Sequence, residues 1–169
     1  MRSPCCAAGT EPETGGVSID ELDDGPEAGG GLSVLGEAEC WEHLTGADVG
    51  RLAFVVAGEP EIFPVNFVVD RRTLVFRTAE GTKLAGLTIA PSVAFEVDGF
   101  DAAGGVAWSV IARGQARRLD RFDDLMQAEQ LAVFPWFASP KPYFIRIEHV
   151  EVTGRKFLAT GHHGDASHP

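Results

Sequence analysis

A run of cationic, hydroxyl-bearing and glycine residues between Thr73 and Leu84 has the chemistry of a phosphate-binding site. Its first half alternates with a period of two, which is typical of a half-buried strand. The alternation ends after Ala79, and the residues from Lys83 to Leu87 favour a short helix. A strand that leads into a helix N-terminus can aim backbone N–H groups at an anion. The residues that could hold a phosphate monoester there are Arg77, Thr78, Gly81, Thr82 and Lys83.

Each residue type in this run would have its own role toward a phosphate. The guanidinium of Arg77 offers a planar pair of donors, whereas the ammonium of Lys83 offers a point charge. Gly81 would let backbone N–H groups approach closely. The run also has a plainer interpretation, in which a strand with an exposed arginine precedes a solvated helix with an exposed lysine. Both residue types are common on protein surfaces.

Six strands and three helices are predicted to position this run. Short strands bounded by turn residues, with helices after the third and the fifth strand, predict an antiparallel barrel that is mainly β with minor α. The predicted strands are 51–57, 62–70, 73–79, 92–100, 107–118 and 143–153, and the predicted helices are 37–44, 83–87 and 121–134.

Two residues inside the predicted strands indicate irregular backbone. Pro64 cannot donate to a β ladder, so it belongs at an edge or a bulge. There it would leave backbone groups free beside Asn66, where a flat polar ligand could dock. Gly114 interrupts the strand at 107–118 and suits a bend in a barrel.

The composition predicts one soluble globular domain between two tails. Of the 169 residues, 44% are hydrophobic and 23% are charged, which is ordinary for such proteins. Residues 1–31 are rich in Gly, Pro, Ser, Asp and Glu, and are predicted to be a disordered acidic tail. Residues 32–160 form the predicted domain, and residues 161–169 form a flexible C-terminal tail.

Charge and hydropathy argue against several classes of partner. The net charge is −11, and residues 1–36 alone hold seven acidic residues against one arginine. This acidity argues against nucleic acid and against an anionic membrane surface, so any anion site must be a local pocket. No apolar run approaches the roughly 20 residues that span a bilayer. Because Met1 to Gly16 lacks the apolar centre of a signal peptide, we expect a cytoplasmic protein.

Motifs for catalysis and for metal binding are missing from the sequence. It has no Ser-His-Asp or Cys-His signature, no Gly-x-Gly-x-x-Gly after a strand and no Walker pattern, so no catalytic residue is assigned. His162, His163 and His168 lie in the predicted C-terminal tail, where no second shell could orient them, and no metal site is predicted. A phosphate cradle on an all-β scaffold suits a planar, phosphate-bearing cofactor that carries redox chemistry.

Four stretches of the sequence resemble one known family. They are Ile62-Phe-Pro-Val-Asn-Phe-Val-Val-Asp70, Val75-Phe-Arg-Thr-Ala-Glu-Gly-Thr-Lys-Leu84, Val93-Ala-Phe-Glu-Val-Asp98, and Trp108-Ser-Val110 with Gly114. In their order and spacing, over about residues 35–155, the chain resembles the actinobacterial branch of the pyridoxamine 5′-phosphate oxidase-like, FMN-binding split-barrel family.

The resemblance implies a six-stranded antiparallel split β-barrel with short flanking helices, and a homodimer with two FMN sites at the subunit interface. It implies that Arg77, Thr78 and Lys83, with Gly81 beside them, hold the flavin phosphate. The other residues that it assigns to the cofactor are Pro64, Val65 and Asn66, which would line the isoalloxazine ring, and Trp108 and Ser109, on a strand that reaches the site.

The resemblance identifies no substrate. The true oxidases end in a longer segment that bears Arg and Trp and helps bind the substrate, and residues 148–157 depart from it. Conversion of a vitamin is therefore not expected. The predicted function is that of a flavin-dependent oxidoreductase that acts with a small-molecule redox substrate or electron donor. The alternatives are a deazaflavin-dependent reductase and a non-catalytic flavin-binding protein.

Overall fold

The computed structural model describes residues 31–81, 86–87, 90–131, 133 and 141–158. Within these residues the protein is mainly β, with seven antiparallel strands and two helices. The predicted fold class is confirmed, and the predicted count of six strands is too low. The strands are β1 (Ser33–Leu35), β2 (Val49–Val56), β3 (Glu59–Asp70), β4 (Thr73–Thr78), β5 (Ser92–Asp101), β6 (Val106–Arg118) and β7 (Tyr143–Leu158), and the helices are α1 (Glu37–Gly46) and α3 (Phe122–Glu129).

Parts of the prediction fall on residues that the structure does not describe. The N-terminal tail up to residue 30 and the C-terminal tail lie outside the described residues, as does the helix predicted at 83–87 except for Gly86 and Leu87. These segments stay predictions.

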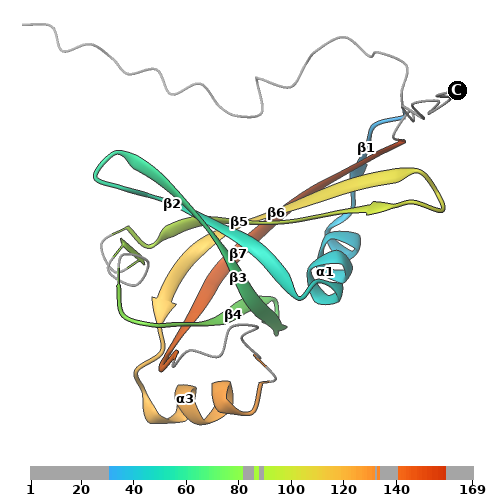
Figure 1. Ribbon diagram of the computed structural model, residues 1–169. Coiled ribbons are helices and arrows are strands. Elements are labelled where there is room, and N and C mark those ends of the chain that lie inside the picture. The colour runs from blue at the N-terminus through green and yellow to red at the C-terminus, as the bar shows by residue number, and fades with distance from the viewer. Residues whose placement is uncertain (1–30, 82–85, 88–89, 132, 134–140, 159–169) are drawn as a thin grey trace, which may run out of the picture.

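The strands close into a ring (Figure 1). Their order is β1-β7-β4-β3-β2-β5-β6, and β6 also pairs with β7, which joins the two sides of the sheet. The β2–β3 hairpin projects to one side of the ring and the β5–β6 hairpin to the other, while β7 runs between them. This is the split barrel that the sequence predicts.

Alternation along the strands gives the sheet an inner face, which fills the barrel, and an outer face. Directly paired residues have their side chains on the same face. Leu52 of β2 pairs with Phe95 of β5, and both are fully buried in the core. Their neighbours Arg51 and Glu96 pair with each other and therefore lie on the outer face. Other fully buried side chains of the inner face are Leu74, Phe76, Val97, Val110, Ile145 and Ile147.

Helix α1 packs against the core with one face. Its buried side chains, Cys40, Trp41 and Leu44, all belong to the core cluster. At its start, Glu39 accepts a hydrogen bond of 3.0 Å from the Gly36 N–H, and this bond lowers the pKa of the exposed Glu39 carboxyl. The helix predicted at 37–44 is confirmed.

Helix α3 covers a second apolar cluster, on the outer face of β4 and β7. This cluster contains Val75, Leu119, Ala128, Val133 and Phe144. The prediction that the helix extends to residue 134 is wrong, because α3 ends at Glu129. There the backbone N–H groups of the next two residues bond to carbonyls three residues back, which tightens the chain out of the α-helical pattern.

Arg117 connects α3 to the sheet. Its guanidinium donates to Glu148 of β7 at 2.8 Å and to Asp124 of α3 at 3.2 Å. The hydrogen bonds from Arg117 hold the pKa of Glu148 below its ordinary value.

Strand β7 continues beyond its predicted end at residue 153. Its last residues pair with both β6 and β1, so neighbours on two sides extend it to Leu158. A β-bulge shifts the β6–β7 register between Arg113 and Gln115. At the bulge, a Cβ on Gly114 would lie 2.6 Å from the Glu148 carbonyl oxygen. The glycine is needed for this close approach, as the sequence predicted for a bend at this position.

Candidate functional site

Strands β3 and β4 separate between the two stretches that were predicted to bind a ligand. Their described pairing ends at Phe67↔Phe76. The next residue of β3, Asn66, pairs with β2 instead, and the next residue of β4, Arg77, pairs with β7. Asn66 and Arg77 are therefore the first residues on either side of the separation, which we call the β3–β4 fork.

Arg77 lies on the outer face at this fork and is half-buried. Its Nε donates a hydrogen bond of 2.9 Å to the Lys141 carbonyl oxygen. Its guanidinium lies over the Phe144 ring, with Cζ 4.7 Å from the ring centroid. These two contacts orient the guanidinium plane. Among the described residues, no acceptor bonds to its terminal nitrogens, so they are available to an anion.

Thr78 follows Arg77 but lies on the opposite, inner face. It is 5% exposed, and its hydroxyl donates to the carbonyl oxygen of Ala79 at 3.3 Å. Gly81 has a φ of +138°, a conformation that favours glycine, and a Cβ there would meet no atom of the other described residues within 4 Å, its chain neighbours aside. Thr82 and Lys83 lie outside the described residues.

Pro64, Val65 and Asn66 lie in the part of β3 whose described pairing is with β2 alone. Pro64 is exposed on the outer face. This is expected for a proline at an edge of a strand that has no described hydrogen-bonded neighbour. Asn66, on the same face, donates from Nδ2 to the Asp48 carbonyl oxygen at 3.4 Å. Val65 is buried in the core, so only its main chain can reach a ligand on the outer face.

Trp108 and Ser109 of β6 also lie on opposite faces. Ser109 is half-buried on the outer face, where it pairs with Asp98. Trp108 packs against the core, and its ring stacks on His43 of α1 at a centroid distance of 4.0 Å. The structure therefore brings Ser109, but not the Trp108 ring, to the face that carries Pro64, Asn66 and Arg77.

The outer-face residues at the fork fit a planar ligand that bears a phosphate. Pro64 and Asn66 present an apolar surface and an amide to a flat ring, and Arg77 presents an oriented guanidinium to a phosphate. The backbone of β3 beyond Phe67, which has no described ladder partner in β4, can add N–H and C=O groups.

A cluster of three charged side chains lies in the centre of the outer face, and no sequence motif predicts it. Arg51 is ion-paired with Asp98 and lies 3.6 Å from Glu96. The hydrogen bond to Asp98 raises the pKa of Arg51. Because Arg51 pairs with Pro64 and Asp98 pairs with Ser109, this group lies between the predicted residues of β3 and those of β6. Alternation predicts that the two carboxylates face outward, but only the strand register brings the arginine to them.

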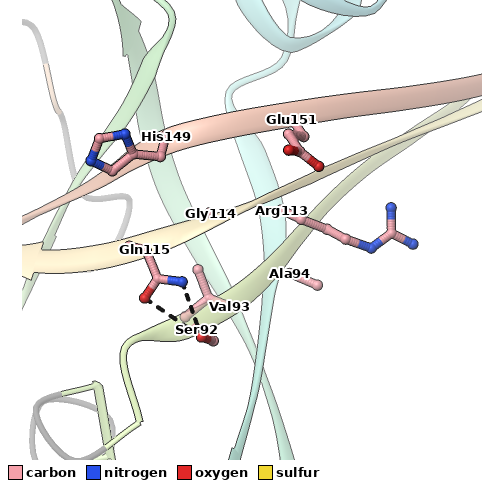
Figure 2. Close-up of a pocket in the computed structure, with 8 residues that line it drawn as sticks. All are labelled: Ser92, Val93, Ala94, Arg113, Gly114, Gln115, His149 and Glu151. Carbon is pink, nitrogen blue, oxygen red and sulfur yellow. Dashed lines mark hydrogen bonds between the residues drawn. The ribbon is translucent and has the colours of Figure 1, made fainter. Parts of the chain in front are cut away.

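A pocket of about 440 Å³ lies on the outer face at the β6–β7 bulge (Figure 2). In it, Gln115 donates to the Ser92 hydroxyl at 3.0 Å. His149 and Arg113 point away from each other. None of the predicted cofactor residues that the structure describes lines this pocket, and its polar side chains do not converge on one point. We therefore assign the fork, and not this pocket, as the candidate cofactor site.

The described part of the chain has neither a cluster of metal ligands nor a helix that could span a membrane. No group of three or more His, Cys, Asp or Glu side chains there could hold a metal ion. None of its helices has the length and apolar character needed to cross a bilayer. The three histidines near the C-terminus lie outside that part of the chain.

Comparisons with known proteins point to one family. Residues 36–156 match the family model described as pyridoxamine 5′-phosphate oxidase. An FAD binding protein from Mycobacterium smegmatis is 40% identical, with a TM-score of 0.64 over 75% of this chain and 98% of its own. An uncharacterized Mycobacterium tuberculosis protein, Rv3129, is 40% identical over 90 residues, which are 53% of this chain and 80% of its own. A FAD-binding protein from Mesorhizobium loti shares the fold, with 24% identity and a TM-score of 0.66 over 76% of this chain and 98% of its own.

Proposed function

The chain belongs to the pyridoxamine 5′-phosphate oxidase family, and on this premise we propose that it is a flavin-dependent oxidoreductase that binds FMN. The observation that carries the proposal is the β3–β4 fork, which has Asn66 on one side and Arg77 on the other, both on the outer face. The Mycobacterium smegmatis relative, which is 40% identical, is named as an FAD binding protein, and this supports a flavin ligand.

The residues at the fork would contact different parts of the ligand. Pro64 and Asn66 would contact the isoalloxazine ring with their side chains, and Val65 would contribute main-chain groups. Arg77 would hold the phosphate through charge-assisted hydrogen bonds from its terminal nitrogens. The contacts of Arg77 with Phe144 and the Lys141 carbonyl support this role, because they orient the guanidinium before the ligand arrives.

A bound flavin supplies the transfer of a hydride or of single electrons. The residues at the fork would orient its ring and shield one side of it from water. No described residue is assigned to proton transfer. The redox partner is proposed as a small molecule, and the protein is proposed to act in the cytoplasm.

FAD is a second candidate ligand, because the relative with 40% identity carries FAD in its name. FAD has the same ring as FMN and a phosphate at the same position, so the fork could hold its flavin half in the same way. A deazaflavin coenzyme and a flavin-binding role without turnover are the remaining alternatives.

An absorption spectrum tests the proposal. Protein that is incubated with FMN and then desalted should retain bands near about 370 and 450 nm, which belong to the flavin. Addition of NADH or NADPH without air should bleach the longer-wavelength band if the protein is an oxidoreductase. Bleaching by dithionite but by neither nucleotide would support the non-catalytic alternative. Loss of all FMN on desalting, with retention of a deazaflavin, would support the reductase alternative.

We also propose that two copies of the chain associate through the outer face and complete the flavin site between them. Large apolar side chains are exposed on this face of β2, β3, β5 and β7. They are Val55 (53% exposed), Ile62 (65%), Phe100 (60%) and Phe157 (45%). Exposed apolar side chains spread across one sheet face are typical of a protein–protein interface.

Ile62→Asp should convert this dimer into a monomer. The variant would place an unpaired carboxylate in the interface, and burial of an unpaired charge is strongly unfavourable. Light scattering at micromolar concentration should give the mass of two 18.0 kDa chains for the wild type and of one chain for the variant. An obligate interface of this kind should bury upwards of about 2,000 Å².

Met126→Asp is the matched control for the dimer experiment. Met126 is also an exposed apolar residue, at 49%, but it lies on α3 and not on the sheet. This variant should keep the dimer. A wild-type mass equal to one chain would contradict the proposed homodimer.

A further inference from the structure

Strand alternation divides the predicted phosphate cradle between two faces of the sheet. Arg77 pairs with Phe144, which packs in the outer cluster under α3. Thr78 pairs with Tyr143, which packs against the barrel core. A phosphate at the end of β4 would therefore meet the Arg77 side chain on one face and the Thr78 side chain on the other.

A second arginine lies on the inner face beside Thr78. Arg118 is the last residue of β6, and it pairs with the core residue Ile145. Its guanidinium lies over the Tyr143 ring, with Cζ 4.3 Å from the ring centroid. Because Tyr143 is the direct partner of Thr78, this stacking holds Arg118 next to the end of β4.

Arg118 differs from its neighbour Arg117 in its charge partners. Arg117 is saturated by Glu148 and Asp124. Among the described residues, no carboxylate lies within ion-pair distance of Arg118, and its contact is with the ring of Tyr143. The nearby carboxylate of Glu80 accepts a hydrogen bond of 2.6 Å from the Tyr143 hydroxyl, which holds it at the tyrosine. The guanidinium of Arg118 thus has donors available for an anion.

A cavity of about 210 Å³ adjoins Arg118 at this end of the barrel. Its described lining includes Arg118, Ala116 and Ile145, which share the inner face, and also Arg117, Leu87 and Pro91. Its volume is several times the roughly 30 Å³ that a water molecule occupies in the liquid, so there is open space beside Arg118.

We propose that Arg118 is a further phosphate-binding cation of this site, and that it reaches the phosphate monoester from the inner face while Arg77 reaches it from the outer face. The proposal rests on the proposed function and adds to it a residue that lies far from Arg77 in the sequence. Two guanidinium groups on opposite sides would match the two negative charges of a phosphate dianion.

Arg118→Gln should weaken FMN binding roughly tenfold, the lower end of the range for one charge-assisted hydrogen-bonding group, because Arg118 is exposed. Riboflavin has no phosphate, so its affinity should not change. Arg118→Lys should recover part of the FMN affinity by restoring the charge. Both ligands are titrated into apo wild type and apo variants by flavin fluorescence. Arg71→Gln, which removes an exposed arginine from the turn at the opposite end of β4, controls for net charge and should bind FMN as the wild type does.

Tyr143 gives a readout that does not depend on flavin, because it is the single tyrosine of the chain. Its hydrogen bond to Glu80 raises the pKa of the phenol, and the charge of Arg118 opposes that rise. Ultraviolet titration of apo Arg118→Gln should therefore show a phenol pKa higher than in the wild type. An unchanged phenol pKa would show that Arg118 does not stack on Tyr143, and would overturn the proposal.

The outcomes separate this proposal from the proposed function. Wild type that prefers FMN to riboflavin, with Arg118→Gln unchanged in FMN affinity, would overturn the role of Arg118 and leave the flavin proposal intact. Equal losses of affinity for FMN and riboflavin in Arg118→Gln would also overturn the role of Arg118, since they would show that Arg118 supports the fold and does not contact the phosphate. Wild type with no preference for FMN over riboflavin would overturn both proposals.

Discussion

Phe95→Ala should lower the free energy of unfolding by about 3–5 kcal/mol. Phe95 is 0% exposed, and its ring contacts Phe67 of β3 edge-on at a centroid distance of 4.6 Å. It pairs with Leu52 on one side and with Ala112 on the other, so truncation would leave a cavity in the centre of the barrel. Urea denaturation at a fixed protein concentration measures the change.

The expected loss is a large share of the roughly 5–15 kcal/mol that stabilises a typical domain. Phe122→Ala is the matched control, because Phe122 of α3 is 75% exposed. Its effect should stay within about 0.5 kcal/mol, as for most surface substitutions. Similar losses for the two variants would show that Phe95 does not fill the barrel as described.

Arg77→Ala should weaken FMN binding by about 1.5–3 kcal/mol, which corresponds to roughly 10- to 150-fold in the dissociation constant. The variant removes charge-assisted hydrogen bonds to the phosphate. These bonds come from a guanidinium that Phe144 and the Lys141 carbonyl already orient before the ligand binds. Arg77→Lys should recover only part of the affinity, because an ammonium cannot replace the planar fork of donors. Fluorescence titration of FMN into the apo proteins gives the dissociation constants.

Two controls accompany the Arg77 variants. Arg71→Ala removes an exposed arginine from the β3–β4 turn and should leave FMN affinity unchanged. Riboflavin affinity should be nearly the same in wild type and in Arg77→Ala. If riboflavin and FMN lost affinity equally, Arg77 would be supporting the fold or the ring, and its assignment to the phosphate would be wrong.

The strands of the barrel could be predicted because their signals are local. Val93, Phe95 and Val97 alternate with Ala94 and the acidic residues Glu96 and Asp98, and the structure places the three large apolar side chains on the inner face as expected. Strand β1 was missed because three residues are too few for an alternation to be detected, and β1 forms only by pairing with β7. The last residues of β7 were also missed, because they are held in the strand by pairing with neighbouring strands and their own sequence has no clear strand pattern.

The candidate site could be predicted only in part. A contiguous run indicated a phosphate cradle, but adjacent residues of a strand face opposite ways, so Arg77 and Thr78 cannot present their side chains to one face. The contact of Arg51 with Asp98, and that of Arg118 with Tyr143, join strands that are distant in the sequence. Such contacts depend on the register between strands, and one sequence does not determine that register.

The relative affinity of the apo wild-type protein for FMN and riboflavin shows whether the β3–β4 fork binds a phosphate, because the two ligands share a ring and differ by the phosphate. If the β3–β4 fork grips the phosphate, FMN should bind at least about tenfold more tightly than riboflavin, and the difference should shrink as salt screens the charges. Equal affinities for the two ligands, or no binding of either, would show that the fork does not bind a flavin phosphate.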